Sequence, residues 1–242
     1  MSALRLAIFS LCSALAAAPS LYAETIEGSV NLSGVVPPAT TLQRSSDPFC
    51  ARTAVRDPSV LASAGKLQNV WVRVVKGAPD QLGKNEKVVE ITQRQCMYEP
   101  RLVAMQAGNT LVMKNEDPVL HNVHAYAGVS TLFNRAMPGN GGKPISFDQK
   151  SARPTSEWEG LMKWKCDVHP WMKVFVGVAK NPYFATTGAD GKYLIEGIPP
   201  GRYTLAAWHE RFGEKLVEVT VEAGQPAKLD FLFESGARAS NP

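Results

Sequence analysis

Short segments rich in β-branched and aromatic residues, each ended by Gly, Pro, Asn or Asp, recur along most of this chain. Such segments predict strands joined by tight turns. The predicted strands are Ile26–Ser33, Asn69–Val75, Val88–Gln93, Thr110–Lys114, Trp158–Cys166, Met172–Val178, Arg202–Trp208, Leu216–Val221 and Leu229–Phe233. Long helical periodicity is absent, although Pro58–Gly65 has room for one helical turn. The pattern predicts an all-β fold built from antiparallel β-sandwiches.

The first 23 residues have the features of a secretory signal peptide. Arg5 is followed by an apolar run from Leu6 to Ala18, and the segment ends in the small residue Ala23. We expect cleavage after Ala23, export to a bacterial periplasm and no stable membrane insertion afterwards. A retained membrane anchor is the alternative, but the run is short for a span. Lipidation at Cys12 is disfavoured because small residues do not precede it.

Length and net charge limit the number of domains and the kinds of partner. The 242 residues suffice for one large or two small domains. The formal net charge of +4 is mild, and no basic stripe of the kind that binds nucleic acid is present. We therefore expect no nucleic-acid partner.

Export changes how the cysteines are interpreted, because an oxidising compartment favours disulfides. Without Cys12 three remain, Cys50, Cys96 and Cys166, which allow three pairings. The neighbours of Cys166 mark it as the unpaired thiol, so we predict a Cys50–Cys96 disulfide. Closing this loop of about 46 residues is worth roughly 4 kcal/mol in the chain-entropy description. The alternative is two buried free thiols.

The chemistry concentrates in one segment, in which Cys166, His169 and Met172 follow one another at intervals of three. A regular strand would place Cys166 and His169 on opposite faces, so the chain must turn between them, and Pro170 favours this. A thiolate, an imidazole and a thioether are the donors of a blue-copper site. Zinc seldom uses a thioether. A binuclear copper centre and a covalent haem would each need a second cysteine there.

The second histidine of such a site must be His121, His124 or His209. If the chain around the first two is extended, they point to opposite faces and cannot bind one ion. His121 shares its face only with apolar residues, which favours it as the buried ligand. We expect His124 to be structural or on the outer face, and His209 to be structural or exposed.

The segments Asn115–His124 and Cys166–Met172 resemble the two ligand segments of cupredoxins, with the short ligand loop of the amicyanin and plastocyanin type. The resemblance implies a Greek-key β-sandwich over residues 86–180. It also implies one copper ion, with His121, Cys166 and His169 as equatorial ligands and Met172 as the axial ligand.

The cupredoxin resemblance assigns two further roles. Asn122 would fasten the ligand loops by hydrogen bonds. His169 would lie at a loop tip as the electron port, with Pro170 and Trp171 around it as a docking patch. The longer, Gly-rich stretch Thr131–Thr155 departs from the family pattern.

A second resemblance covers Ala185–Leu205, which looks like the carboxypeptidase regulatory-like, or transthyretin-like, β-sandwich. We assign this domain to residues 181–236, followed by a tail at 237–242. Its usual first strands resemble segments within 24–85, before the copper-like domain. We therefore favour a cupredoxin inserted into this sandwich, over a decorated cupredoxin followed by a separate domain.

Together these features predict a periplasmic type 1 copper protein that carries single electrons and is not an enzyme. Its expected partners are redox proteins, such as a c-type cytochrome or a dehydrogenase. A copper-delivery protein is the main alternative. Copper catalysis is disfavoured because four ligands leave no open position, and a Cys166–His169 hydrolase lacks an orienting third residue.

Overall fold

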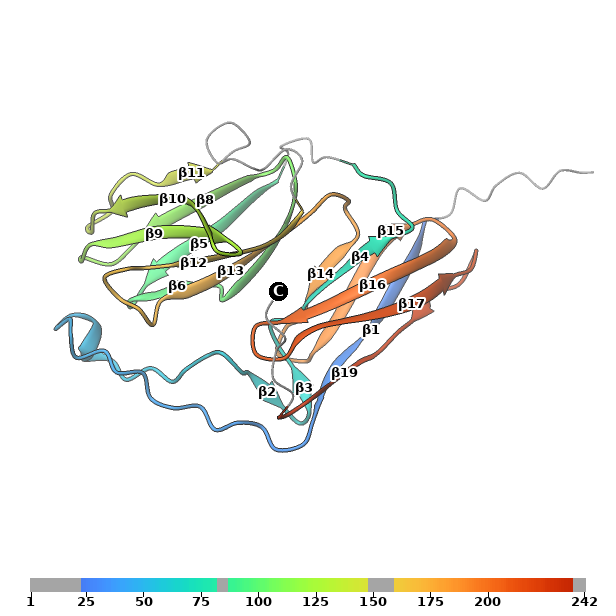
Figure 1. Ribbon diagram of the computed structural model, residues 1–242, viewed down its shortest axis with the longest axis horizontal. Coiled ribbons are helices and arrows are strands. Elements are labelled where there is room, and N and C mark those ends of the chain that lie inside the picture. Colours follow the sequence, from blue (N-terminus) through green and yellow to red (C-terminus); the bar gives the residue numbers. More distant parts are fainter. Residues whose placement is uncertain (1–22, 82–86, 148–158, 237–242) are drawn as a thin grey trace, which may run out of the picture.

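The computed structural model describes residues 23–81, 87–147 and 159–236, and nearly all of their regular structure is β-strand (Figure 1). The predicted all-β class is confirmed. One 3₁₀ turn, η1 (Cys50–Arg52), is the single helical element among these residues. No helix of the described part is long and apolar enough to cross a membrane. The predicted signal peptide, apart from Ala23, and the tail lie outside the described residues.

The first sandwich is formed by the middle of the chain. Its five-stranded sheet has the order β10-β9-β12-β13-β7, and its four-stranded sheet the order β11-β8-β5-β6. The bounds are β5 (Val88–Arg94), β6 (Met97–Glu99), β7 (Leu102–Gln106), β8 (Thr110–Asn115), β9 (His121–Ala127), β10 (Ser130–Met137), β11 (Ile145–Phe147), β12 (Gly160–Lys165) and β13 (Lys173–Ala179). The apolar faces of the two sheets pack against each other and form the core of this sandwich, in which Met113, Trp164 and Val176 are at most 1% exposed.

The second sandwich combines strands from both ends of the described chain. Its sheets have the orders β15-β1-β3-β2, with β18 and β19 also on β1, and β14-β4-β16-β17. The bounds are β1 (Glu24–Ser33), β2 (Ala62–Ser63), β3 (Lys66–Leu67), β4 (Trp71–Lys76), β14 (Phe184–Thr186), β15 (Lys192–Ile198), β16 (Gly201–His209), β17 (Gly213–Val221), β18 (Ala227–Lys228) and β19 (Phe231–Glu234).

The pairing of strands shows how the two sandwiches are connected. Strand β1 is antiparallel to β15, and β4 is antiparallel to both β14 and β16. Strands that precede the first sandwich in sequence are therefore hydrogen-bonded to strands that follow it. The first sandwich interrupts the second, which is the arrangement that the sequence favoured.

A small third core joins the two sandwiches. Trp71 of β4, Leu102 of β7 and Ala179 of β13 are buried together, at most 5% exposed. The Arg101 guanidinium also forms a largely buried ion pair with Glu210, at 2.8 Å. The sandwiches thus contact each other through side chains as well as through the strands that connect them.

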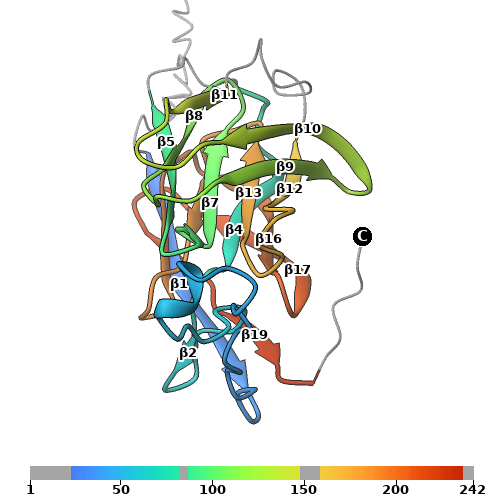
Figure 2. The same ribbon diagram turned by 90° about the vertical axis from the view of Figure 1, so that its left-hand side faces the viewer.

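Between β1 and β2 the chain makes a long excursion, residues 34–61, which we call the cap segment. It leaves the second sandwich, reaches the end of the first and returns, and η1 lies at its far point (Figures 1 and 2). Phe49 packs against the core of the first sandwich, and Cys50 is disulfide-bonded to Cys96 at an S–S distance of 2.00 Å. The cap segment is therefore attached to the sandwich that carries the predicted ligands.

Two local expectations need correction. The stretch Pro58–Gly65, which had room for one helical turn, forms no helix. Its second half belongs to a hairpin of β2 and β3, because Ala64 and Gly65 both have positive φ and form a tight turn. No strand was predicted for the first part of the Gly-rich stretch, but residues 130–137 form strand β10, which pairs with β9 from Ser130 to Met137 with one irregularity between Thr131 and Phe133.

Candidate metal centre

The Cys166–Met172 segment is the turn between β12 and β13, which are paired neighbours. The Cys166 amide donates to the Met172 carbonyl at 3.2 Å, and the Met172 amide donates to the His169 carbonyl at 2.9 Å. These bonds close the turn that the spacing required. Cys166 and Met172 are both 0% exposed.

His121 enters the same place from the neighbouring strand. It is the first residue of β9, which pairs with β12, and Asn122 lies against Cys166. His121 is fully buried together with Val123 and Ala125, so the face predicted from the sequence is the buried face.

Three of the predicted donors converge. The ligand atoms of His121, Cys166 and His169 lie within 4.8 Å of one another, and all three residues are buried. The two Nδ1 atoms are 2.9 Å apart, and the Cys166 Sγ lies 3.7 Å from the His169 Nδ1. Met172 is buried in the core of the same sandwich.

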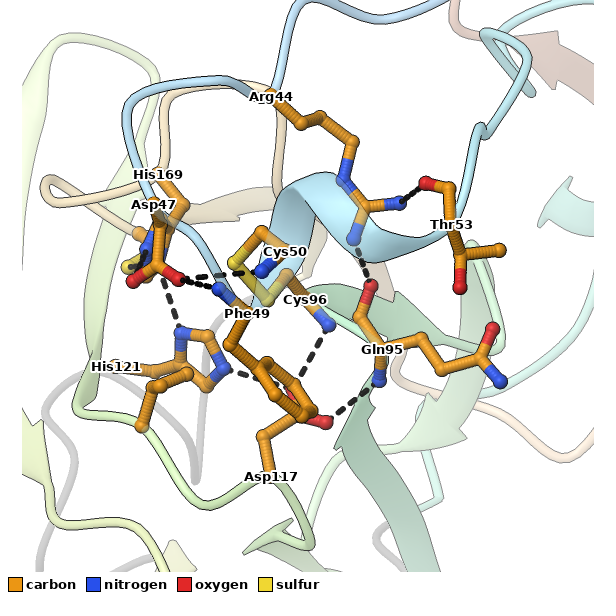
Figure 3. Close-up of a disulfide and its surroundings, with 12 residues drawn as sticks. Arg44, Asp47, Phe49, Cys50, Thr53, Gln95, Cys96, Asp117, His121 and His169 are labelled. Carbon is orange, nitrogen blue, oxygen red and sulfur yellow. Dashed lines mark hydrogen bonds and ion pairs between the residues drawn. A yellow bond between two sulfur atoms is a disulfide. The ribbon is translucent and has the colours of Figure 1, made fainter.

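The other ring nitrogen of His121 is bound by Asp117. The His121 Nε2 lies 2.8 Å from the Asp117 Oδ2, and this carboxylate also accepts the amides of Gln95 and Cys96 at 2.6 and 2.8 Å (Figure 3). Burial by itself would raise the pKa of Asp117, but these bonds hold it below its ordinary value. Asp117 is therefore ionised at neutral pH.

His169 is bound in the same way by a residue of the cap segment. Its Nε2 lies 3.2 Å from the Asp47 Oδ2, while the Asp47 Oδ1 accepts the amides of Phe49 and Cys50 (Figure 3). The pKa of Asp47 is lowered, since these bonds outweigh the effect of burial. His169 lies in the turn between β12 and β13, but it is only 1% exposed because the cap segment covers it. Its imidazole therefore does not reach the surface, as the predicted electron port at a loop tip would.

The two carboxylates decide which histidine atoms are left for a ligand. An ionised carboxylate only accepts hydrogen bonds, so each Nε2 must be the donor. Both Nδ1 lone pairs then face each other beside the thiol of Cys166. Two buried acceptors at 2.9 Å need a cation or a proton between them. In the metal-free chain a proton fits there: burial lowers the pKa of His121, but Asp117 and Cys166 together raise it above its ordinary value.

Asn122 connects the two ligand segments. Its side-chain oxygen accepts the Asp167 amide at 2.7 Å, and its backbone amide points at the Cys166 Sγ at 3.5 Å. Its side-chain nitrogen donates to Asn134 and to the Asp167 carboxylate. These contacts are of the kind expected of a residue that fastens the loops.

The other two histidines lie away from the centre. His124 is on the opposite face of β9, where its Nδ1 is 2.9 Å from Asp167 and its ring stacks on Tyr126. His209 is buried in the second sandwich, stacked on Phe212. Neither shares the buried space of the three donors.

The predicted docking patch is only partly open. Pro170 is exposed, but Trp171 is half-buried and its indole N–H donates to the Cys96 carbonyl at 2.9 Å. The Arg44 guanidinium lies over the Trp171 ring and donates to the carbonyls of Thr53 and Gln95. A docking role for Pro170 and Trp171 stays a prediction.

Sequence reasoning missed Asp47 and Asp117. Each precedes a proline, in Asp47-Pro48 and Asp117-Pro118, and that dipeptide indicates a turn. The signal was thus present for a turn. It could not show that each carboxylate also reaches a histidine.

Comparisons with known proteins matched the chain to a domain family and to solved structures. The profile of the carboxypeptidase regulatory-like domain matches residues 173–234. This confirms the resemblance to that domain, and the matched residues begin in β13, before the boundary predicted at residue 181. No curated protein sequence matches the chain.

Among solved structures, the chain is similar to cupredoxins. A purple cupredoxin from Nitrosopumilus maritimus is 24% identical over 38% of this chain and 99% of its own, with a TM-score of 0.31. Amicyanin from Paracoccus versutus is 18% identical over 45% and 97%, also at 0.31. A copper-containing nitrite reductase from Thermus scotoductus is 15% identical over 63% of this chain and 28% of its own, at 0.32. Likenesses of this degree do not transfer a function.

Proposed function

We propose that this chain binds one copper ion through His121, Cys166 and His169, with Met172 as the axial ligand, and carries single electrons between redox proteins of the periplasm. The observation that supports this most is the pair of Nδ1 lone pairs, which face each other beside a thiol in a buried space. A soft thiolate with two imidazoles is the donor set that suits copper. The residues present therefore fit the ion.

The surroundings of the ligands suit electron transfer better than catalysis or metal delivery. Bound copper supplies a one-electron couple between Cu(I) and Cu(II). The chain holds the donors at the start of β9 and in the turn that joins β12 to β13, and carboxylates fix both rings, so little movement accompanies a change of charge. Burial of all four ligands leaves little room for a substrate or for a protein that would take the metal.

The test is the visible absorption and electron paramagnetic resonance spectrum of the protein after addition of Cu(II). We expect an intense thiolate-to-copper band that Cys166→Ser removes. His121→Gln should abolish the band, whereas His124→Gln, a matched change on the other face of the same strand, should keep it. A blue Cys166→Ser protein, or an equal loss in both histidine variants, would show that the ligands are assigned wrongly.

The carrier role needs a second measurement. The copper protein should be reduced and reoxidised reversibly by one electron, and it should accept electrons from a small redox protein such as a c-type cytochrome. Tight binding of Cu(I) without a stable Cu(II) form would favour copper delivery instead.

A further inference from the structure

The cap segment contributes one charged side chain to the centre, although it belongs to neither sheet of the first sandwich. Asp47 is 122 residues from His169 in sequence, and its Oδ2 lies 3.2 Å from the His169 Nε2. Its side chain is 21% exposed, against 1% for the histidine, so the carboxylate lies between the imidazole and solvent.

The two oxygens of Asp47 have separate partners. Oδ1 accepts the Phe49 and Cys50 amides at 2.8 and 3.1 Å, which begins the η1 turn. Oδ2 is left for His169. Three attachments hold this turn in place: the Cys50–Cys96 disulfide, the bonds from Arg44 to the Gln95 and Thr53 carbonyls, and the packing of the half-buried Phe49 against the core of the first sandwich. The position of Oδ2 is therefore fixed by the turn and not by a mobile side chain alone.

We infer that Asp47 is a positioning residue for the metal centre: it holds the His169 imidazole with Nε2 protonated and Nδ1 free to bind the ion, and it closes that edge of the ring to solvent. The inference rests on the proposed function, because it assigns Nδ1 to copper. A carboxylate on the far nitrogen of a ligand histidine fixes the ring orientation and makes the imidazole a stronger donor. A stronger donor stabilises Cu(II) more than Cu(I), so Asp47 lowers the reduction potential.

The first test needs no metal. In the metal-free, disulfide-bonded protein labelled with ¹⁵N at histidine, long-range ¹H–¹⁵N spectra report which ring nitrogen carries the proton. We expect His169 to carry it on Nε2 in the wild type. The Asp47→Asn comparison is made in a His121→Ala background, because a proton on the His121 Nδ1 would by itself keep the His169 Nδ1 an acceptor. In that background Asp47→Asn should remove the preference for Nε2. The matched control is Asp57→Asn, which removes the same charge from the cap segment, where the Asp57 carboxylate accepts the Ser59 amide. It should leave His169 unchanged. Protonation of wild-type His169 on Nδ1, or a ring that Asp47→Asn leaves unaltered in the His121→Ala background, would overturn the inference.

The second test measures the copper protein. Loss of such a histidine partner typically weakens metal binding by about 10- to 100-fold. If Asp47→Asn weakens Cu(II) tenfold more than Cu(I), the reduction potential rises by about 59 mV, the one-electron equivalent. Asp57→Asn should keep the wild-type potential. A potential in Asp47→Asn equal to that of the wild type would count against Asp47.

A second variant at the same position tests whether the effects of Asp47→Asn come from disruption of the turn. Serine is a good acceptor for turn amides but is too short to reach His169, so Asp47→Ser should keep the disulfide and the stability while giving the same two changes. The outcomes also separate the two proposals. If the proton preference changes as expected but the wild type forms no thiolate–copper band, the copper function fails and the positioning by Asp47 stands. If the thiolate–copper band forms but neither the proton position nor the reduction potential changes in the Asp47 variants, the copper function stands and the positioning by Asp47 fails.

Discussion

Met172 is the weakest donor of the proposed set, and its place in the turn is fixed by the backbone. Its amide and carbonyl bond to His169 and Cys166, so the residue stays in position when its side chain changes. The side chain is fully buried, and a buried site of this kind tolerates replacement by another apolar residue of similar volume.

We predict that Met172→Leu keeps the visible band and raises the reduction potential. Loss of a thioether donor favours Cu(I), and each tenfold change in the preference is worth about 59 mV. Redox titration followed at the visible band measures the shift. Met105→Leu, a buried methionine of the same core on β7, should not move the potential. A fall in potential, or an equal rise in both variants, would remove Met172 from the ligand set.

At the scale of single elements, His209 at the end of β16 shows how burial makes one strand sensitive to pH. It is 1% exposed, and its Nδ1 accepts the Arg211 amide at 3.2 Å. Burial first, then the charges of Arg211 and Arg101, lower the pKa of His209 to about 3. His209 is therefore neutral in the folded protein across the ordinary pH range.

The unfolded chain binds a proton at His209 near pH 6.5, whereas the folded chain does so only near pH 3. Stability due to this group is thus complete above about pH 6.5 and falls as the pH drops below it, by up to about 1.4 kcal/mol per pH unit. We predict that His209→Gln removes about 2 to 3 kcal/mol of the loss that the wild type shows between pH 7 and pH 4.5. Urea unfolding at both pH values measures this. The same loss in both proteins would contradict the assignment, whatever their stabilities at pH 7.

At the scale of the whole molecule, the contact between the sandwiches depends on a glycine. Gly177 of β13 faces Trp71 of β4, and a Cβ at position 177 would lie 2.5 Å from the indole ring. The ring has little freedom to move, because the Arg73 guanidinium covers it at 4.1 Å. A strand of one sandwich therefore accepts a tryptophan of the other only where it has no side chain.

We predict that Gly177→Ala lowers the free energy of unfolding by about 1 to 3 kcal/mol, as overpacking does. In a Trp71→Leu background the same change should cost clearly less, because the clash is gone and contacting residues are not additive. Gly188→Ala is the control, since a Cβ there meets only the Asp190 carboxylate at an ordinary 3.7 Å. Equal costs of Gly177→Ala in both backgrounds would show that the two residues do not contact each other.

Some strands could be predicted from the sequence and others could not. Alternation along Met172–Val178 predicted β13 to within a residue at each end, because burial on one face fixes a period of two. The β10 strand was missed: its residues are mostly exposed or half-buried, so it lacks that alternation and is held by its pairing with β9. The hairpin at residues 62–67 was missed because its strands are only two residues long.

Local spacing, the choice of face and the resemblance to cupredoxins led to the prediction of Cys166, His169, Met172 and His121 as ligands. The neighbours of Cys166 led to the predicted pairing of Cys50 with Cys96. What only the tertiary structure decided is which groups stand behind the two histidines, and that His169 is covered. Asp47 and Asp117 reach the rings from turns whose partners lie far away along the chain or on another strand. A periodic pattern reports the faces of one element, whereas the approach of a carboxylate to a ring depends on how separate elements pack, and no local pattern encodes that distance.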